Sequence, residues 1–160
     1  MKKKEIALIV HNVRSVYNVG SIFRTADAVG ITNIYLTGYS PTPLDRFGWA
    51  RKDVAKSALG AEKFVQWEYC KMINNVIQKL KRQNYFIIAL EQSKKSVDYK
   101  KIKLPVNKST VIIVGNEVKG LSDSILDQCD VIAEIPMNGK KESLNVAVSL
   151  GIALFRILNI

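Results

Sequence analysis

Residues 131–160 read VIAEIPMNGKKESLNVAVSLGIALFRILNI, and this stretch decides the fold class. It opens with a short apolar run, Val131–Pro136, and closes with a segment, Leu144–Ile160, that is apolar around most of its circumference. A short apolar run followed by a longer one predicts a buried strand and then a buried helix, as in an α/β fold. The link between them contains Pro, Asn, Gly, two lysines, Glu and Ser. Polar groups at the entry to a buried helix lead us to predict a ligand site there.

Similar apolar, β-branched runs occur earlier in the chain, and helical patterns lie between them. Because most of these runs are continuously apolar rather than alternating, we expect strands buried on both faces. The clearest helical stripe lies in Glu68–Gln83. The pattern predicts one α/β domain, residues 1–160, with a mostly parallel sheet and helices on both faces. The predicted strands are Glu5–Val10, Asn33–Tyr39, Phe86–Glu91, Thr110–Gly115 and Val131–Pro136.

The charge of the chain points to a partner. Its 160 residues include 24 Lys+Arg against 14 Asp+Glu, a formal net charge of +10. An excess this large favours a polyanion, with nucleic acid first and an anionic membrane second. The alternative is a basic surface without a specific partner.

The closing segment approaches the length of a membrane span. Polar or small residues interrupt it at Asn145, Ser149, Gly151, Arg156 and Asn159. These interruptions disfavour a transmembrane role. We expect protein to cover the apolar surface instead, and a partner subunit is the natural source.

Several classes of site are disfavoured. Cys70, Cys129 and the single His11 do not have a metal-binding spacing, so we expect no metal and two buried, reduced thiols in a cytoplasmic protein. No predicted strand is followed by GxGxxG or GxxxxGK[ST], which disfavours Rossmann-type dinucleotide enzymes and P-loop NTPases. GxSxG is also missing, which disfavours a hydrolytic triad around His11.

Three segments carry unusual polar residues. In the first, YNVGSIFRTADAVG (residues 17–30), an apolar helix face leaves Asn18, Arg24 and Asp27 pointing away from it. Asn18 and Gly20 stand where we expect the helix cap, and the free N–H groups of a cap favour anions. The same spacing also fits a capped surface helix with a solvated arginine.

The second segment, GNEVKGLS (residues 115–122), follows a predicted strand, and ligands bind at the carboxyl ends of strands in open α/β sheets. Gly115 allows close backbone approach and Glu117 places a charge there, although an exposed loop carboxylate is the alternative. In the third segment, the polar link quoted first, we expect Ser143 to cap the last helix and Asn145 to lie one turn inside it. A buried Asn needs a partner, which can be the backbone or a ligand.

The order N-x-G-x-x-x-R-T-A-D-A-x-G, G-x-E-x-x-G-L-S and I-P-M-x-G-x-x-x-S-L-N-V resembles the SPOUT superfamily of RNA methyltransferases, in its SpoU/TrmH branch, over nearly the whole chain. The resemblance implies an α/β domain with a deep C-terminal trefoil knot. It implies methyl transfer from S-adenosylmethionine to a ribose 2′-hydroxyl of tRNA or rRNA, without a metal. It also implies a homodimer with shared active sites, paired through the last helix and the helix of the first pattern.

The resemblance also implies the site residues. Backbone groups of Gly115, Ile135, Met137 and Leu144 would hold S-adenosylmethionine. The implied catalytic residues are Arg24, Asn18, Glu117, Ser143 and Asn145. Because a guanidinium normally stays protonated in proteins, we expect Arg24 to orient the RNA and stabilise the developing alkoxide rather than remove a proton.

Basic residues outside this set are the candidates for RNA contacts: Arg14, Arg46, Arg51 and Lys52. Phe47 and Trp49 lie among them, and an exposed ring could stack on an unpaired base, but we expect both in the core or in dimer packing. Two alternatives remain open. One is a non-catalytic RNA-binding dimer of the same knotted fold, which has little need of the catalytic set. The other is a basic α/β domain for an unrelated nucleotide, which the missing phosphate loops disfavour.

Overall fold

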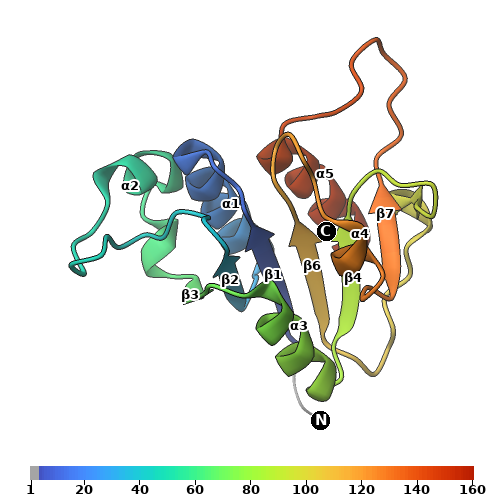
Figure 1. Cartoon of the computed structure of the whole chain (residues 1–160), viewed down its shortest axis with the longest axis horizontal. Helices are drawn as coiled ribbons and strands as arrows, with labels where there is room; N and C mark the ends of the chain where they lie inside the picture. Colours follow the sequence, from blue (N-terminus) through green and yellow to red (C-terminus); the bar gives the residue numbers. More distant parts are fainter. Residues whose placement is uncertain (1–3) are drawn as a thin grey trace.

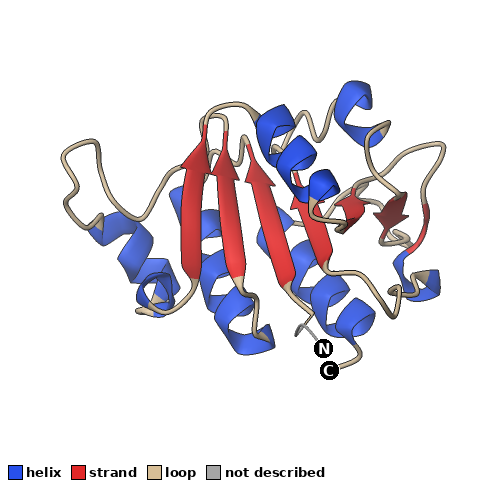
Figure 2. Ribbon diagram, turned by 90° about the horizontal axis from the view of Figure 1, so that it is seen from below, coloured by secondary structure: helices blue, strands red, loops and turns tan. Residues whose placement is uncertain are grey.

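The computed structural model describes residues 4–160, which form a single seven-stranded sheet (Figure 2). The order across the sheet is β3-β2-β1-β6-β4-β7-β5, and all neighbours are parallel. The strands are β1 (Ile6–His11), β2 (Asn33–Thr37), β3 (Gln66–Cys70), β4 (Phe86–Leu90), β5 (Val97–Asp98), β6 (Thr110–Val114) and β7 (Val131–Glu134). The α/β class is therefore confirmed, as are the five predicted strands, now β1, β2, β4, β6 and β7.

Helices cover both faces of the sheet, as expected (Figures 1 and 2). The helices are α1 (Val16–Val29), α2 (Lys52–Ala58), α3 (Ile73–Arg82), α4 (Asp123–Leu126) and α5 (Val146–Leu158), with short 3₁₀ turns η1 (Ala61–Lys63) and η2 (Tyr99–Lys101). Successive strand residues point to opposite faces, so Leu8 and Val10 of β1 share a cluster with α1 and α5. Ala7 and Ile9 share the opposite cluster with α3 and α4.

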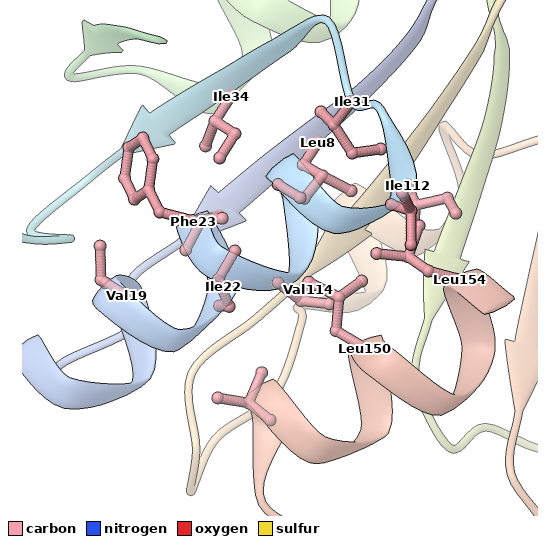
Figure 3. Packing of buried hydrophobic residues seen from close by; sticks show 14 of the residues in the cluster. Leu8, Val19, Ile22, Phe23, Ile31, Ile34, Ile112, Val114, Leu150 and Leu154 are labelled. Atoms are coloured by element: carbon pink, nitrogen blue, oxygen red, sulfur yellow. The ribbon is translucent and has the colours of Figure 1, made fainter. Parts of the chain in front are cut away.

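The contact between α1 and α5 is the part of the core that positions the site (Figure 3). Ile22 and Phe23 of α1 and Leu150 and Leu154 of α5 are all fully buried. Burying such a side chain is worth about 1.5–3 kcal/mol. Each helix follows a parallel strand, β1 or β7, so both begin at the carboxyl edge of the sheet. Their packing therefore holds two helix N-termini at one edge.

The helix predicted over Glu68–Gln83 is wrong in its first turn. Residues Gln66–Cys70 form β3, an edge strand paired with β2, and the helix begins at Ile73. An edge strand has one neighbour and stays partly exposed, so it lacks the continuous apolar run that identifies the inner strands. The apolar stripe of α3 starts only at Ile73.

Both predicted helix caps are also wrong. Ser15, not Asn18, caps α1, because its Oγ accepts the Asn18 N–H at 3.2 Å. Asn145, not Ser143, caps α5: its Oδ1 accepts the N–H groups of Ala147 and Val148 at 2.9 and 3.2 Å. Asn145 therefore lies at the helix entry rather than one turn inside.

Other expectations concern burial and topology. Cys70 and Cys129 are free thiols, but both are half-buried rather than fully buried. No helix in residues 4–160 combines the length and the apolar character needed to cross a membrane. The trefoil knot stays a prediction.

Candidate functional site

A cavity of ≈ 310 Å³ opens at the carboxyl edge of the sheet, between the loops that follow β4, β6 and β7. In Figure 1 the loop after β6 and the long excursion from β7 to α5 lie at the same end of the sheet. The strand order reverses at β4, because β6 lies on one side of it and β7 on the other, and the cavity lies at the ends of these three strands. Ligands bind at this switch point in open α/β sheets. The cavity is named the cofactor cavity below.

The residues predicted to hold the cofactor come together around this cavity. Gly115, Ile135, Met137 and Leu144 all line it, although they come from segments far apart in the sequence. Gly115 is needed because a Cβ there would lie 2.8 Å from the backbone C and O of Gly120. The loop after β6 thus folds back against its own first residue, and a side chain would push it apart.

A chain of hydrogen bonds connects three loops beside the cofactor cavity. Glu117 accepts the backbone N–H groups of Arg14 and Ser15, each at 3.0 Å, and the Asn18 side-chain amide at 3.1 Å. Asn145 donates from Nδ2 to Asn18 Oδ1 at 2.9 Å. Glu117, Asn18 and Asn145, called the amide network below, therefore join the N-termini of α1 and α5 to the loop after β6.

These contacts determine the charge of Glu117. Burial raises its pKa, but the hydrogen bonds from the N–H groups of Arg14 and Ser15 and from Asn18 outweigh burial and hold the pKa below the ordinary value. The carboxylate is therefore ionised at neutral pH. It also lies at the N-terminus of α1, where the helix dipole favours a negative charge.

The remaining catalytic candidates are placed differently. Ser143 lines the cofactor cavity but is outside the amide network. Arg24 is on the exposed side of α1, and it does not line the cavity. It lies six positions after Asn18, which is about 9 Å along a helix at 1.5 Å per residue. The structure therefore gathers Asn18, Glu117, Ser143 and Asn145 at one place and leaves Arg24 apart.

Asn116, which was not among the predicted site residues, shapes the loop after β6. It is a buried polar residue, and its Oδ1 accepts the N–H groups of Val118 and Lys119 at 2.9 and 2.8 Å. Its Nδ2 donates to the Asn12 carbonyl and to the Tyr39 hydroxyl, both at 3.0 Å. Asn116 stands inside the quoted GNEVKGLS segment, so its place next to Glu117 was the available signal.

Residues of the β4 loop were also missed, and they add negative charge. Glu91 lines the cofactor cavity and accepts the Leu121 N–H at 2.8 Å. Gln92 donates to the Glu142 carbonyl at 2.6 Å and so joins the β4 loop to the loop that enters α5. The carboxylates lining the cavity are Glu91, Glu117, Glu134 and Glu142.

His11 is the last residue of β1. Asn12 donates to its Nε2 at 3.0 Å, so Nδ1 carries the proton and donates to Thr37 Oγ1 at 2.9 Å. Burial lowers the pKa of His11, which keeps the imidazole neutral at pH 7. Within residues 4–160 there is no group of three or more His, Cys, Asp or Glu side chains arranged to hold a metal ion.

Three of the four residues predicted to contact RNA line two further hollows. Arg14 lines a hollow beside the site, and Arg46 and Arg51 line another, farther along the same edge. Arg51 also pairs with Asp53 at 2.6 Å, and Lys52 is exposed at the start of α2. Phe47 and Trp49 were expected in the core or in dimer packing; the core placement is wrong, because they are 71% and 73% exposed, and dimer packing stays a prediction.

Known proteins resemble the chain over nearly its whole length. The tRNA (guanosine(18)-2′-O)-methyltransferase of Aquifex aeolicus is 34% identical over 157 residues, 96% of this chain and 69% of that protein. The AdoMet-bound rRNA methyltransferase from Sinorhizobium meliloti superposes with a TM-score of 0.88 and 27% identity, covering 99% of this chain but 57% of that one. The A. aeolicus TrmH/SpoU tRNA modifying enzyme gives a TM-score of 0.83 and 29% identity over 99% and 76%.

The chain thus spans between 57% and 76% of the length of these relatives. The model of the SpoU rRNA Methylase family matches residues 5–155. All three quoted patterns and the whole cofactor cavity fall within that match. The chain belongs to the SpoU rRNA methylase family.

Proposed function

We propose that the chain is an S-adenosylmethionine-dependent methyltransferase that acts on a ribose 2′-hydroxyl of tRNA or rRNA, and that it works in the cytoplasm. The single observation that supports this most directly is that the cofactor cavity and the amide network share Glu117. A ligand held in the cavity would therefore lie next to an ordered set of polar side chains. The proposal extends to the family's dimeric, knotted form and to residues 1–160 as one methyltransferase domain.

The cofactor cavity suits S-adenosylmethionine in size and chemistry. Its volume, ≈ 310 Å³, falls at the lower end of the usual range for small-molecule sites, roughly 300–1,000 Å³. Among residues 4–160 the N–H groups of Met137 and Leu144 find no acceptor, so both can bind a ligand. The carboxylates that line the cavity suit a ligand that carries a sulfonium and an ammonium group. Gly115, Ile135, Met137 and Leu144 would hold the cofactor.

When bound, S-adenosylmethionine supplies a methyl group on an electrophilic sulfur, so the protein mainly has to align the hydroxyl behind it. The amide network can provide that alignment. Glu117 fixes Asn18, and Asn18 fixes Asn145, so neither amide is free to rotate. A carboxylate with a lowered pKa is a weak base, and we therefore assign Glu117 to positioning rather than to removing the proton. Ser143 faces the same space and can bind the RNA.

The position of Arg24 favours a dimer with shared sites. Arg24 is exposed and does not line its own cofactor cavity, and we infer that it acts on the cavity of a second copy, where it would hold phosphate and stabilise the alkoxide. Val148, Ile152 and Phe155 form an apolar stripe on α5 that is 51%, 40% and 43% exposed, and Tyr17 of α1 is 59% exposed. A second copy would cover this surface and bring its Arg24 to the site.

The test is a transfer assay. Purified protein is incubated with methyl-labelled S-adenosylmethionine and total RNA, and the RNA is then digested with alkali. We expect the label in alkali-resistant dinucleotides, because a 2′-O-methyl group blocks cleavage of the adjacent phosphodiester. Label found only in base products would contradict the proposal. RNA binding without any transfer would favour the non-catalytic RNA-binding dimer instead.

A further inference from the structure

Three hollows follow one another along the carboxyl edge of the sheet. Next to the cofactor cavity is the middle hollow, ≈ 400 Å³, lined by Arg14, Tyr39, Asn116, Val118 and Lys119. It shares Asn116 and Val118 with the cofactor cavity. The outer hollow, ≈ 550 Å³, shares Tyr39 with the middle one. The shared residues make the three hollows a continuous surface.

The charge on this surface is positive away from the cofactor cavity. The middle hollow contains Arg14 and Lys119 and no carboxylate among its lining residues. The outer hollow is lined by Arg46 and Arg51 and by one acid, Asp45. Asp45 is occupied as a hydrogen-bond acceptor of its own turn. Along this edge the lining residues thus change from four carboxylates in the cofactor cavity to mostly cationic side chains in the other two hollows.

The outer end carries two aromatic rings on a turn built to expose them. Asp45 Oδ1 accepts the N–H groups of Phe47 and Trp49 at 2.8 and 2.9 Å, and Asp45 N–H donates to the Trp49 carbonyl at 2.8 Å. Gly48 has φ +81°, a conformation that a residue with a side chain rarely adopts. In Figure 1 this turn is part of the long loop between β2 and α2 that extends from the body of the molecule. The hydrogen bonds fix the backbone of Phe47 and Trp49, and both side chains stay exposed.

We propose that the middle and outer hollows form a track for single-stranded RNA, in which phosphates lie against Arg14, Lys119 and Arg46 and an unpaired base stacks on Trp49. The inference rests on the proposed function, since it names how the RNA substrate approaches that site. Cationic grooves with exposed rings bind single strands because every base presents a stackable face. A second copy of the chain is a less suitable occupant of the outer hollow, because its net charge is also +10.

Arg46 lines the outer hollow next to Phe47. Its guanidinium lies 4.7 Å from the centroid of the Phe47 ring, so one face of that ring is covered by a cation. Trp49 has no such cover recorded in residues 4–160 and is 73% exposed. Arg46 and Phe47 line the outer hollow, and Trp49 stands beside it on the same Asp45 turn. Trp49 is therefore the ring available to a base at the edge of this hollow.

The experiment measures RNA binding without cofactor, so it does not depend on methyl transfer. The protein has two tryptophans, and Trp67→Phe leaves Trp49 as the only indole. Bulk tRNA should quench the fluorescence of this variant, whereas a perfect RNA duplex of equal phosphate content should quench it much less. Trp49→Ala should raise the dissociation constant for bulk tRNA roughly 5- to 100-fold, and Trp49→Phe should restore most of the affinity.

Phe64→Ala is the matched control, because Phe64 is 78% exposed but follows η1, outside the Asp45–Trp49 turn that borders the outer hollow. Arg46→Ala should lower the salt dependence of binding, which Trp49→Ala should leave unchanged. Wild-type affinity in Trp49→Ala, equal losses in Phe64→Ala, or dissociation of a dimer by Trp49→Ala would each overturn the inference. If the wild type binds tRNA as described but transfers no methyl group, the track stands and the proposed function fails.

Discussion

Gly115→Ala tests whether the loop after β6 must close tightly to form the cofactor cavity. The added Cβ would lie 2.8 Å from the C and O atoms of Gly120 and from Leu121 Cδ2. Unstrained contacts between carbon atoms lie at about 3.5–4.0 Å, so the loop must open by roughly 0.7–1.2 Å. The Leu121 methyl group can rotate away, whereas the Gly120 backbone is held between Asn116 and Glu91.

The cost can be estimated from the packing. Overfilling a close-packed site costs about 1–3 kcal/mol. The free protein can relieve this strain by letting the loop move outward, but binding requires the closed loop, so the cost appears as lost affinity. Because 1.4 kcal/mol is a factor of ten, we expect S-adenosylmethionine to bind roughly 5- to 150-fold more weakly. The free energy of unfolding should fall by less than the binding energy does.

Calorimetric titration with S-adenosylmethionine measures the affinity, and urea denaturation measures the stability. Gly139→Ala is the control, because Gly139 lies in the loop between β7 and α5 and a Cβ there would meet nothing within 4 Å. It should bind the cofactor like the wild type. A folded Gly115→Ala protein with wild-type affinity would refute the reasoning, and so would an equal loss in Gly139→Ala.

Further predictions concern Arg24, the helices and pH. Arg24→Ala should reduce methyl transfer by two or more orders of magnitude, because one electrostatic contact to developing charge is worth about 10²–10³ in rate. Binding of S-adenosylmethionine should stay within about twofold of wild type. Unchanged transfer would contradict the role proposed for Arg24. Gly151→Ala should raise the free energy of unfolding by about 0.5–1 kcal/mol in urea denaturation, because the new Cβ would meet only Thr25 Cγ2, at an ordinary 3.8 Å. Asn145→Ala should lower the free energy of unfolding by about 1–2 kcal/mol, since it removes the cap of α5. Asn145→Asp keeps the cap acceptor but loses the donor to Asn18. It should therefore lose methyl transfer with a smaller loss of stability. Because the pKa of Glu117 is lowered, its stabilising effect is fully present above the ordinary carboxyl pKa and is lost as pH falls through the folded-state pKa. The difference in free energy of unfolding between wild type and Glu117→Gln should therefore narrow on acidification. A difference that is constant with pH would contradict a role for the Glu117 charge.

The inner strands could be predicted from the sequence because a strand covered on both faces needs an unbroken apolar run. β3 gave no such signal, because its residues are partly exposed at the sheet edge, and its segment was absorbed into the neighbouring helical stripe. The same limit applies to Trp49. An aromatic residue is expected in the core on average, and only the turn made by Asp45 places this one outside.

The site was predictable as far as it depends on strand ends. Parallel strands bring the segments after β6 and β7 to one edge, so the meeting of Gly115 with Met137 follows from the fold class. The pairing of Asn18 with Asn145 does not follow, because it joins residues 127 positions apart through one rotamer of each side chain. The position of Arg24 is a third case: helix spacing shows that it faces away from the core, but not which site it serves.

The amide network is also a capping network, and this links stability to function in this molecule. Glu117 binds the first N–H groups at the entry of α1, and Asn145 both caps α5 and holds Asn18. The positions of the Asn18 and Asn145 amides thus depend on two helix N-termini that are fixed by buried α1–α5 packing. A substitution at the caps should therefore lower stability and transfer together, whereas Gly151→Ala strengthens α5 away from its entry and should raise stability without changing transfer. If transfer instead rose or fell with stability in Gly151→Ala as well, general rigidity rather than the position of the caps would control the rate.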